Sequence, residues 1–215
     1  NYLYFYDFGD YQIIGASPES LVSVKQGQVT TNPIAGTRPR GKDEREDKAL
    51  AEELLADEKE VAEHRMLVDL GRNDIGKIAQ NNSVEVTKYM EVEYFRYVMH
   101  LTSVVRGQLL PQLTAMDALK STLPAGTVSG APKIRAMKRI YELEQEKRGV
   151  YAGAIGYLSA TGDMDFAIAI RTMILKNGRA YVQAGAGIVY DSIPANEYQE
   201  TINKAKSMTK IGEIQ

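Results

Sequence analysis

The sequence predicts an α+β fold in which helices flank large, mainly antiparallel sheets. Three observations predict it. Short alternating or aromatic-rich runs are separated by glycine turns, several longer stretches carry helical periodicity, and strands and helices follow one another in mixed order. The chain has 215 residues, which suits one large domain or two small ones, and it contains no internal repeat and no linker.

Composition excludes several classes of function. The 26 basic and 28 acidic residues give a formal net charge of −2, which argues against a nucleic-acid-binding protein. The chain has no Cys, so disulfides, thiol nucleophiles and thiolate metal sites are excluded. No apolar run is long enough to predict a membrane span.

The first half is predicted to form a meander followed by a long helix and two strands. Short strands are expected near 2–8, 11–15, 21–24 and 29–31. Residues 33–41 are rich in Pro, Gly and Arg and are expected to form a loop. The stretch 44–70 has no Gly or Pro and an apolar stripe, which predicts one helix that ends at the glycines of 71–76. Two strands then follow, near 84–92 and 95–106.

The second half is predicted to contain helices, three strands and a last helix. The expected elements are helices near 114–121 and 132–147, strands near 151–160, 166–176 and 179–189, and a helix near 195–211. Pro132 suits the first residue of its helix, because its fixed φ angle is compatible with a helical first turn.

Two pairs of glutamates stand one helical turn apart. Glu60 and Glu63 form one pair, and Glu197 and Glu200 form the other, with Lys204 four residues further on. A solvated helix face explains either pair alone. Two pairs together also fit a Mg²⁺ site between helices, because Mg²⁺ prefers carboxylate oxygens. The spacing leaves both interpretations open.

Three further segments have features of anion sites. The loop at 124–133 opens a helix but lacks the Gly-Lys-Ser/Thr of a P-loop, so it predicts at most an anion near the helix start. Arg171 interrupts an apolar strand and needs a carboxylate partner, either a structural one or a ligand. The glycines of 183–189 indicate either a close backbone approach or a bulge.

The two histidines do not suggest a catalytic triad. His100 lies in a predicted strand, where a hydrogen-bonded core role and a catalytic role both remain open, and His64 beside the Glu pair is expected to be structural. Nothing in the chain matches a nucleophile elbow with its Ser-His-Asp partners.

Seven segments together resemble the chorismate-binding enzymes and, within that family, the members that form anthranilate. They cover nearly the whole chain in the family order: residues 33–41, 60–74, 98–100, 124–133, 167–171, 183–188 and 197–205. The resemblance implies a chorismate-binding α/β sandwich of which residues 1–215 are the C-terminal portion. An upstream part of the same domain and a separate N-terminal domain would then be absent.

The resemblance also implies roles for the residues left ambiguous above. Mg²⁺ would be held principally by Glu63 and Glu200, with Glu60 and Glu197 in support, and Glu60 would also take part in catalysis. His100 would stand near the departing ring hydroxyl as an acid or orienting group, and Thr127 would lie against the substrate. The substrate-binding residues implied are Thr37, Thr127, Arg171, Gly185, Ala186, Gly187 and Lys204.

The implied reaction is the Mg²⁺-dependent conversion of chorismate and ammonia to anthranilate and pyruvate in tryptophan biosynthesis. A partner glutamine amidotransferase would supply the ammonia, with no nucleic acid and no membrane involved, and the location would be the cytoplasm. Aminodeoxychorismate synthases are similar but typically carry a nucleophilic Lys where this chain has Ala35. Isochorismate synthase and a truncated, inactive binding fragment are the remaining alternatives.

Overall fold

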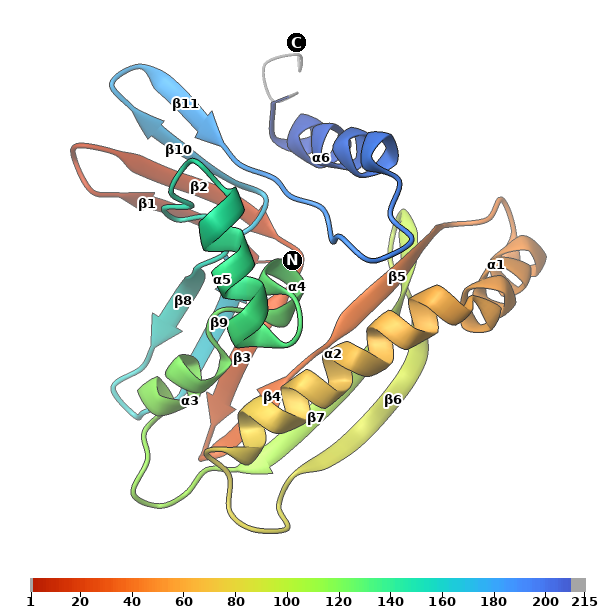
Figure 1. Ribbon diagram of the computed structural model, residues 1–215. Helices are drawn as coiled ribbons and strands as arrows, with labels where there is room; N and C mark the ends of the chain where they lie inside the picture. Colours follow the sequence, from red (N-terminus) through yellow and green to blue (C-terminus); the bar gives the residue numbers. More distant parts are fainter. Residues whose placement is uncertain (1, 210–215) are drawn as a thin grey trace. The chain divides into compact units, whose positions relative to one another are not determined.

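The computed structural model describes residues 2–209, which form two compact units (Figure 1). The first unit is built from the described residues of three stretches, Asn1–Ser20, Pro124–Gly156 and Phe166–Gln215. The second unit is built from Leu21–Leu123 and Tyr157–Asp165. Each unit carries antiparallel strands and helices, which confirms the α+β prediction.

The sheet of the second unit is organised around its longest strand, β7. On one edge β7 pairs with β5 and β4, on the other edge with β6, and β3 follows β4. The strands are β3 (Ser20–Lys25), β4 (Gln28–Thr31), β5 (Ile34–Pro39), β6 (Glu85–Tyr94) and β7 (Val98–Gln108). All the pairs made by β7 are antiparallel; a short turn joins it to β6, whereas α1, α2 and β6 lie between β5 and β7 in the sequence.

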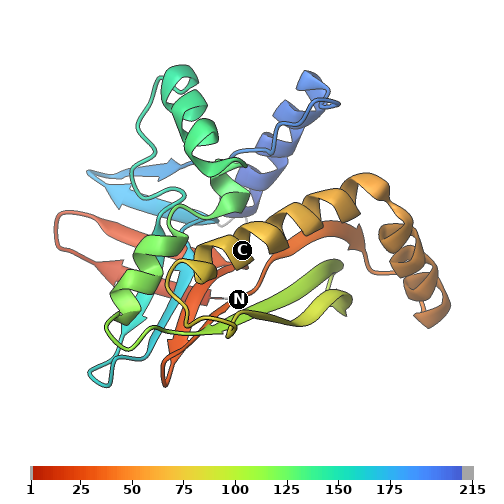
Figure 2. The same ribbon diagram turned by 60° about the horizontal axis from the view of Figure 1, so that its bottom comes forward.

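Two helices cover this sheet, where the sequence predicts one. They are α1 (Glu44–Ala56) and α2 (Glu58–Gly76), and the chain changes direction between them (Figure 2). Asp57 breaks the helix: its carboxylate accepts hydrogen bonds from the backbone N–H groups of Lys59 and Glu60, both at 3.1 Å. An Asp in this position satisfies the free N–H donors at the start of a new helix. The sequence did not indicate a break here, because the stretch 44–70 contains no Gly or Pro.

The second helix runs past Gly71 and ends at Gly76, the second glycine of the segment where its end was predicted. A Cβ placed on Gly71 would lie 3.1 Å from Oγ1 of Thr31 on β4, so the glycine here permits close helix–sheet packing. Gly71 therefore serves packing, whereas the helix ends at Gly76, within the predicted segment. A third, short helix, α3 (Ala115–Thr122), begins at the N-cap Thr114 as predicted.

Residues 33–41 were predicted to form a loop, but most of them form strand β5. The strand pairs with β7, and its register shifts between Ala35 and Arg38. Gly36 lies in this bulge with φ +65°, a conformation that glycine adopts without strain. Local composition indicated a loop, whereas pairing with the long strand β7 makes most of these residues a strand.

The first unit contains a four-stranded antiparallel sheet with the order β1-β2-β10-β11. Its strands are β1 (Tyr2–Asp7), β2 (Gln12–Ser17), β10 (Thr172–Lys176) and β11 (Arg179–Val182). Its helices are α4 (Gly126–Ser129), α5 (Lys133–Leu143) and α6 (Pro194–Thr209). Strands β8 (Ala154–Leu158) and β9 (Met164–Ile168) each begin in one unit and end in the other.

Several predicted boundaries in this half of the chain were wrong. The single strand predicted at 166–176 is two strands, β9 and β10, separated by a bend at Arg171, and the strand predicted at 179–189 ends at Val182. The loop at 124–133 contains the one-turn helix α4, and α5 ends at Leu143 with Pro132 as its N-cap. Residues 210 and 211 of the last predicted helix lie outside the described residues.

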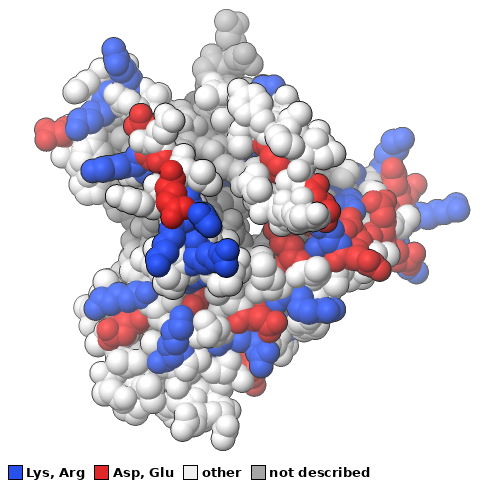
Figure 3. Space-filling model, in the orientation of Figure 1, with Lys and Arg blue, Asp and Glu red and all other residues white. Residues whose placement is uncertain are grey.

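The outer face of α1 is highly charged. Figure 3 shows acidic and basic side chains gathered on the right of the view, where α1 lies. Its buried residues are Asp47, Ala51 and Leu54, and the last two pack with Met99 and Leu101 of β7 in a hydrophobic core. None of the helices in residues 2–209 combines the length and apolarity needed to cross a membrane.

A buried histidine links α2 to the sheet. Nε2 of His64 lies 2.6 Å from Oγ of Ser103 on β7, and the same oxygen accepts a hydrogen bond from the backbone N–H of Met90 at 2.8 Å. His64 is fully buried, and burial lowers its pKa from 6.5 to about 4. The structural role that the sequence suggested for His64 is therefore consistent with its surroundings.

We expect His64 to make the protein less stable in acid. Between pH 6.5 and about 4 the unfolded chain binds a proton at His64 that the folded chain does not, so the free energy of unfolding falls as pH falls. The shift corresponds to at most about 3 kcal/mol. Urea unfolding of the wild type and of His64→Gln across this range should give a shallower pH dependence for the variant, and parallel curves would contradict the prediction.

Candidate functional site

The second unit holds the imidazole that the resemblance assigned to catalysis. Nδ1 of His100 lies 2.8 Å from the carbonyl oxygen of Gly36 and 3.1 Å from Oγ1 of Thr37, and its ring contacts that of Phe95 edge-on. A carbonyl can only accept, so Nδ1 carries a proton. The neutral ring then presents Nε2 as an acceptor, which suits an orienting role and requires the imidazolium form for acid catalysis.

Glu60, the first residue of the first glutamate pair, also lies next to Gly36. A Cβ on Gly36 would lie 3.4 Å from Oε2 of Glu60, which is half-buried, whereas Glu63 on the next turn is exposed. Burial raises the pKa of Glu60, and the charge of Glu63 raises it further. A cation placed by these two carboxylates would relieve their repulsion, so the donor set fits a hard divalent metal.

In the first unit a carboxyl group lies among the predicted substrate-binding residues. Glu19 follows β2, and it makes a hydrogen bond with Thr127 of α4. The charges of Arg171 and Lys204 lower its pKa, but burial raises it more, to about 7. Three of the predicted residues therefore converge on Glu19, which the sequence analysis did not select.

Arg171 reaches this cluster because the backbone bends sharply there. It lies between β9 and β10 with φ 51°, a left-handed conformation that is uncommon for a residue with a side chain. Its carbonyl accepts a hydrogen bond from the backbone N–H of Ala16 on β2 at 3.1 Å, which ties the bend to the sheet. Strain of this kind concentrates at functional sites, where surrounding structure enforces it.

The glycine-rich segment is held between α6 and an aromatic ring. Nζ of Lys204 donates to the carbonyl of Gly185 at 3.3 Å and pairs with Glu200. On the other side, a Cβ on Gly185 would lie 2.7 Å from the hydroxyl of Tyr151, so only glycine fits. The guanidinium of Arg148 covers the Tyr151 ring, and burial raises the pKa of that tyrosine. The interpretation as close backbone approach is therefore favoured over a plain bulge.

The other predicted residues of this unit lie beside a groove of about 300 Å³. Ala186 and Glu197 line it, and Gly187 is exposed between them in sequence. Of the four predicted metal ligands, Glu60 and Glu63 belong to the second unit, and Glu197 and Glu200 belong to the first. Within the described part of either unit, no group of three or more His, Cys, Asp or Glu residues lies close enough to hold a metal ion.

Sequence reasoning missed Glu19 and Tyr151. Glu19 lies in a short Pro-Glu-Ser turn whose composition resembles any surface connection, and its hydrogen-bond partner Thr127 and the cation Lys204 lie on α4 and α6, far along the chain. Tyr151 precedes β8 by three residues and was included in a predicted strand. The one usable signal was the pair of cations, Arg171 and Lys204, which need a counter-charge or an anionic ligand.

Comparison with known proteins gives a consistent family match. The family model described as chorismate binding enzyme matches residues 1–210. Anthranilate synthase component 1 from Lactococcus lactis is 64% identical over 213 residues, covering 99% of this chain and 47% of that protein. The corresponding protein from Aquifex aeolicus is 56% identical over 213 residues, covering 99% and 43%. The chain spans less than half of the length of these relatives.

Two solved structures of related enzymes also superpose on the chain. The crystal structure of anthranilate synthase component I from Streptococcus pneumoniae superposes with a TM-score of 0.91 at 84% identity, covering 97% of this chain and 46% of that one. The menaquinone-specific isochorismate synthase from Escherichia coli superposes with a TM-score of 0.83 at 29% identity, covering 94% and 46%.

We expect the bulge at Gly36 to tolerate no side chain. In Gly36→Ala the new methyl would meet Cδ1 of Leu54 at 2.9 Å, in addition to the strain of a positive φ. Gly162→Ala is the matched control, because Gly162 also has a positive φ, lies in the same unit, and has no atom within 4 Å of the new methyl. The free energy of unfolding in urea should fall about 1–3 kcal/mol further in Gly36→Ala. Equal losses would contradict the packing argument.

Proposed function

The chain belongs to the chorismate binding enzyme family, and on this basis we propose that it is the C-terminal catalytic portion of a lyase. The lyase converts chorismate and ammonia to anthranilate and pyruvate. This reaction belongs to tryptophan biosynthesis and takes place in the cytoplasm. The identity of 64% to an anthranilate synthase component, against 29% to an isochorismate synthase, favours this reaction within the family. The observation that carries the proposal is the convergence of Arg171 and Lys204 beside Thr127, around a carboxyl group with a pKa of about 7.

Substrate binding in this proposal depends on charge. Chorismate is a dianion, and Arg171 and Lys204 supply two cations for its carboxylates. The backbone of Gly185, Ala186 and Gly187 approaches the enolpyruvyl carboxylate, where side chains would block access. Thr127 and, from the second unit, Thr37 contribute hydroxyl groups, and the Tyr151 hydroxyl beside Gly185 borders the same site.

The metal in this proposal is Mg²⁺. Glu63 and Glu200 hold it principally, with Glu60 and Glu197 in support, and the mutual repulsion of Glu60 and Glu63 is the feature of the chain that such an ion relieves. When bound, the ion supplies charge stabilisation at the ring carboxylate of the substrate. All other steps are assigned to the residues of the chain.

Proton transfer to the leaving hydroxyl is assigned to Glu19. A carboxyl with a pKa of about 7 retains a proton near neutral pH and can donate it as the ring C–O bond breaks, so that the hydroxyl departs as water. His100 orients the reacting groups through its free Nε2, because Nδ1 is committed to Gly36. The catalytic role implied for Glu60 is then to hold charge beside Glu63.

Ammonia is the nucleophile, and it comes from a partner glutamine amidotransferase. Ala35 is buried on β5, where aminodeoxychorismate synthases typically have a lysine, and a methyl group cannot form a covalent adduct with substrate. The lone pair of ammonia therefore forms the new C–N bond directly. The carbon that now bears nitrogen then loses its proton and the enolpyruvyl C–O bond breaks, so that the ring becomes aromatic and the leaving enolpyruvate takes up a proton to give pyruvate.

The proposal is tested by following anthranilate fluorescence with chorismate, ammonium and Mg²⁺, using the full-length protein that contains this chain. Anthranilate should form only with Mg²⁺, and Glu200→Gln should lose most of the activity. Glu146→Gln, which changes an exposed residue after α5, should behave as the wild type. Consumption of chorismate without anthranilate would redirect the proposal to aminodeoxychorismate or isochorismate chemistry, and no consumption would reject it.

A second prediction concerns the proton held by Glu19. Because its pKa is about 7, the proton is present below that pH and lost above it, so kcat should fall as pH rises through about 7. Glu19→Gln removes the proton donor, and kcat should fall about 10²–10⁴-fold at neutral pH. The high-pH decline should also disappear in the variant. Retention of both kcat and the pH profile would show that another group is the acid.

A further inference from the structure

Two arginines, Arg38 in β5 and Arg40 just after its end, bind carboxylates of the α1–α2 region. Nε of Arg38 lies 2.9 Å from Oε1 of Glu53 on α1, and its Nη2 lies 2.9 Å from Oδ2 of Asp57. Its Nη1 donates to the carbonyl of Thr37 at 3.1 Å. The Arg38 side chain is only 18% exposed, and of its two carboxylate partners Asp57 is the more sheltered, at 32% against 62% for Glu53.

The partner Asp57 has a second function at the start of α2. Its Oδ1 accepts the backbone N–H groups of Lys59 and Glu60, both at 3.1 Å, while Oδ2 receives Arg38. One carboxylate thus joins the strand to the first turn of the helix. Glu60 belongs to that turn, and its own carboxylate reaches back to Gly36, two residues before Arg38 on β5.

We propose that Arg38 is a positioning residue for the carboxylates of Glu60 and Glu63. Acting through Asp57, it holds the first turn of α2 against β5, which gives the two carboxylates the separation and direction that a divalent cation requires. Groups that orient metal ligands without touching the metal commonly have this effect. The inference rests on the proposed function, since it takes these glutamates to be metal ligands.

The sign of the effect distinguishes position from charge. Arg38 is itself a cation near the carboxylates, and its charge lowers the pKa of Glu60. If it acted only through charge, its removal would strengthen the binding of another cation. If it acts through position, its removal weakens that binding.

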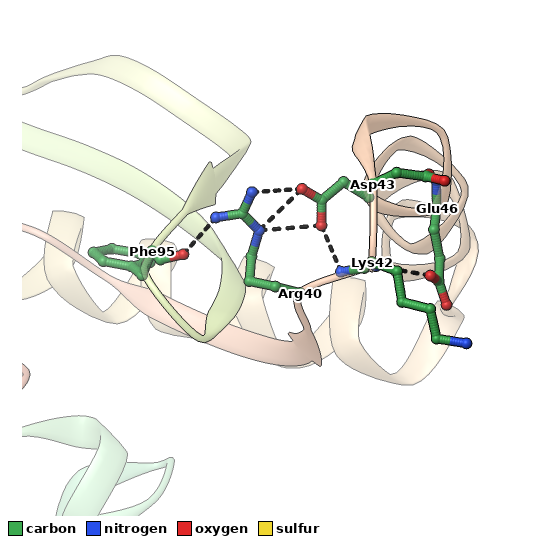
Figure 4. Close-up of polar contacts among 7 residues, drawn as sticks. Arg40, Lys42, Asp43, Glu46 and Phe95 are labelled. Atoms are coloured by element: carbon green, nitrogen blue, oxygen red, sulfur yellow. Dashed lines mark hydrogen bonds and ion pairs between the residues drawn. The ribbon is translucent and has the colours of Figure 1, made fainter.

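Arg40, two residues further along and just after the end of β5, offers a matched control. Its Nε binds Asp47 at 3.0 and 3.1 Å, and its Nη1 donates to the carbonyl of Phe95 at 2.7 Å (Figure 4). Asp47 also accepts from the backbone N–H of Gly41 at 2.6 Å. These contacts tie α1 and the turn between β6 and β7 to the chain at the end of β5, and none of them reaches α2. Loss of Arg40 therefore removes a comparable network without loosening the Glu60 turn.

The test is a calorimetric titration of the full-length protein with Mg²⁺ alone. In Arg38→Gln the Kd for Mg²⁺ should rise about 10–100-fold, whereas Arg40→Gln should match the wild type. Arg38→Lys keeps the charge but cannot bridge Glu53 and Asp57, so it should show most of the loss. Asp57→Ser preserves a helix cap but removes the Arg38 contact, and it should reproduce the effect if Arg38→Gln does not fold.

Unchanged or tighter Mg²⁺ binding in Arg38→Gln or in Asp57→Ser, beside normal binding by the wild type, would overturn the inference. An equal loss in Arg40→Gln would also overturn it, since general loosening of β5 would then explain the result. A wild-type protein that binds no Mg²⁺ would reject the metal site of the proposed function and this inference with it.

Discussion

The close packing of α2 against the sheet of the second unit is the constraint on which its candidate site depends. Two glycines permit it: Gly71 on the helix faces Thr31, and Gly107 on β7 faces Ile75, where an added Cβ would lie 2.6 Å from Cγ2 of that residue. At such a separation a helix cannot rotate without clashes, since protein interiors are close-packed. The hydrogen bond between His64 and Ser103 adds a directional contact to the same interface.

The rotation of α2 about its own axis decides which side chains of its first turns face the sheet and which face solvent. With His64 inside, Glu60 lies near the same helix face and reaches Gly36, and Glu63 is displaced toward solvent. The two carboxylates therefore differ in environment although they are one turn apart. The difference gives Glu60 a raised pKa and leaves Glu63 as the more accessible carboxylate.

In the first unit, burial and charge act in opposition on Glu19. An ionised Glu19 would neutralise Arg171 and Lys204 and would repel an anionic ligand. Because burial outweighs both cations, the carboxyl is mostly protonated below pH 7, and Glu19 then does not neutralise Arg171. The same balance that favours anion binding thus also provides a proton donor, so one arrangement supports two of the proposed roles.

The sequence by itself determined the fold class, most strands and helices, and the residues through which the family was recognised, because these depend on periodicity, caps and motif order along the chain. It also singled out Arg171, Lys204 and the paired glutamates, whose chemistry is visible in their residue types. Tertiary structure alone decided that residues 34–39 form β5, that the chain bends at Arg171, and that Glu19 is buried beside Thr127. Each of these depends on partners between 60 and nearly 190 residues away, such as β7 for β5 and Lys204 for Glu19. Strand pairing and burial are set by such long-range contacts, and local sequence patterns do not encode them.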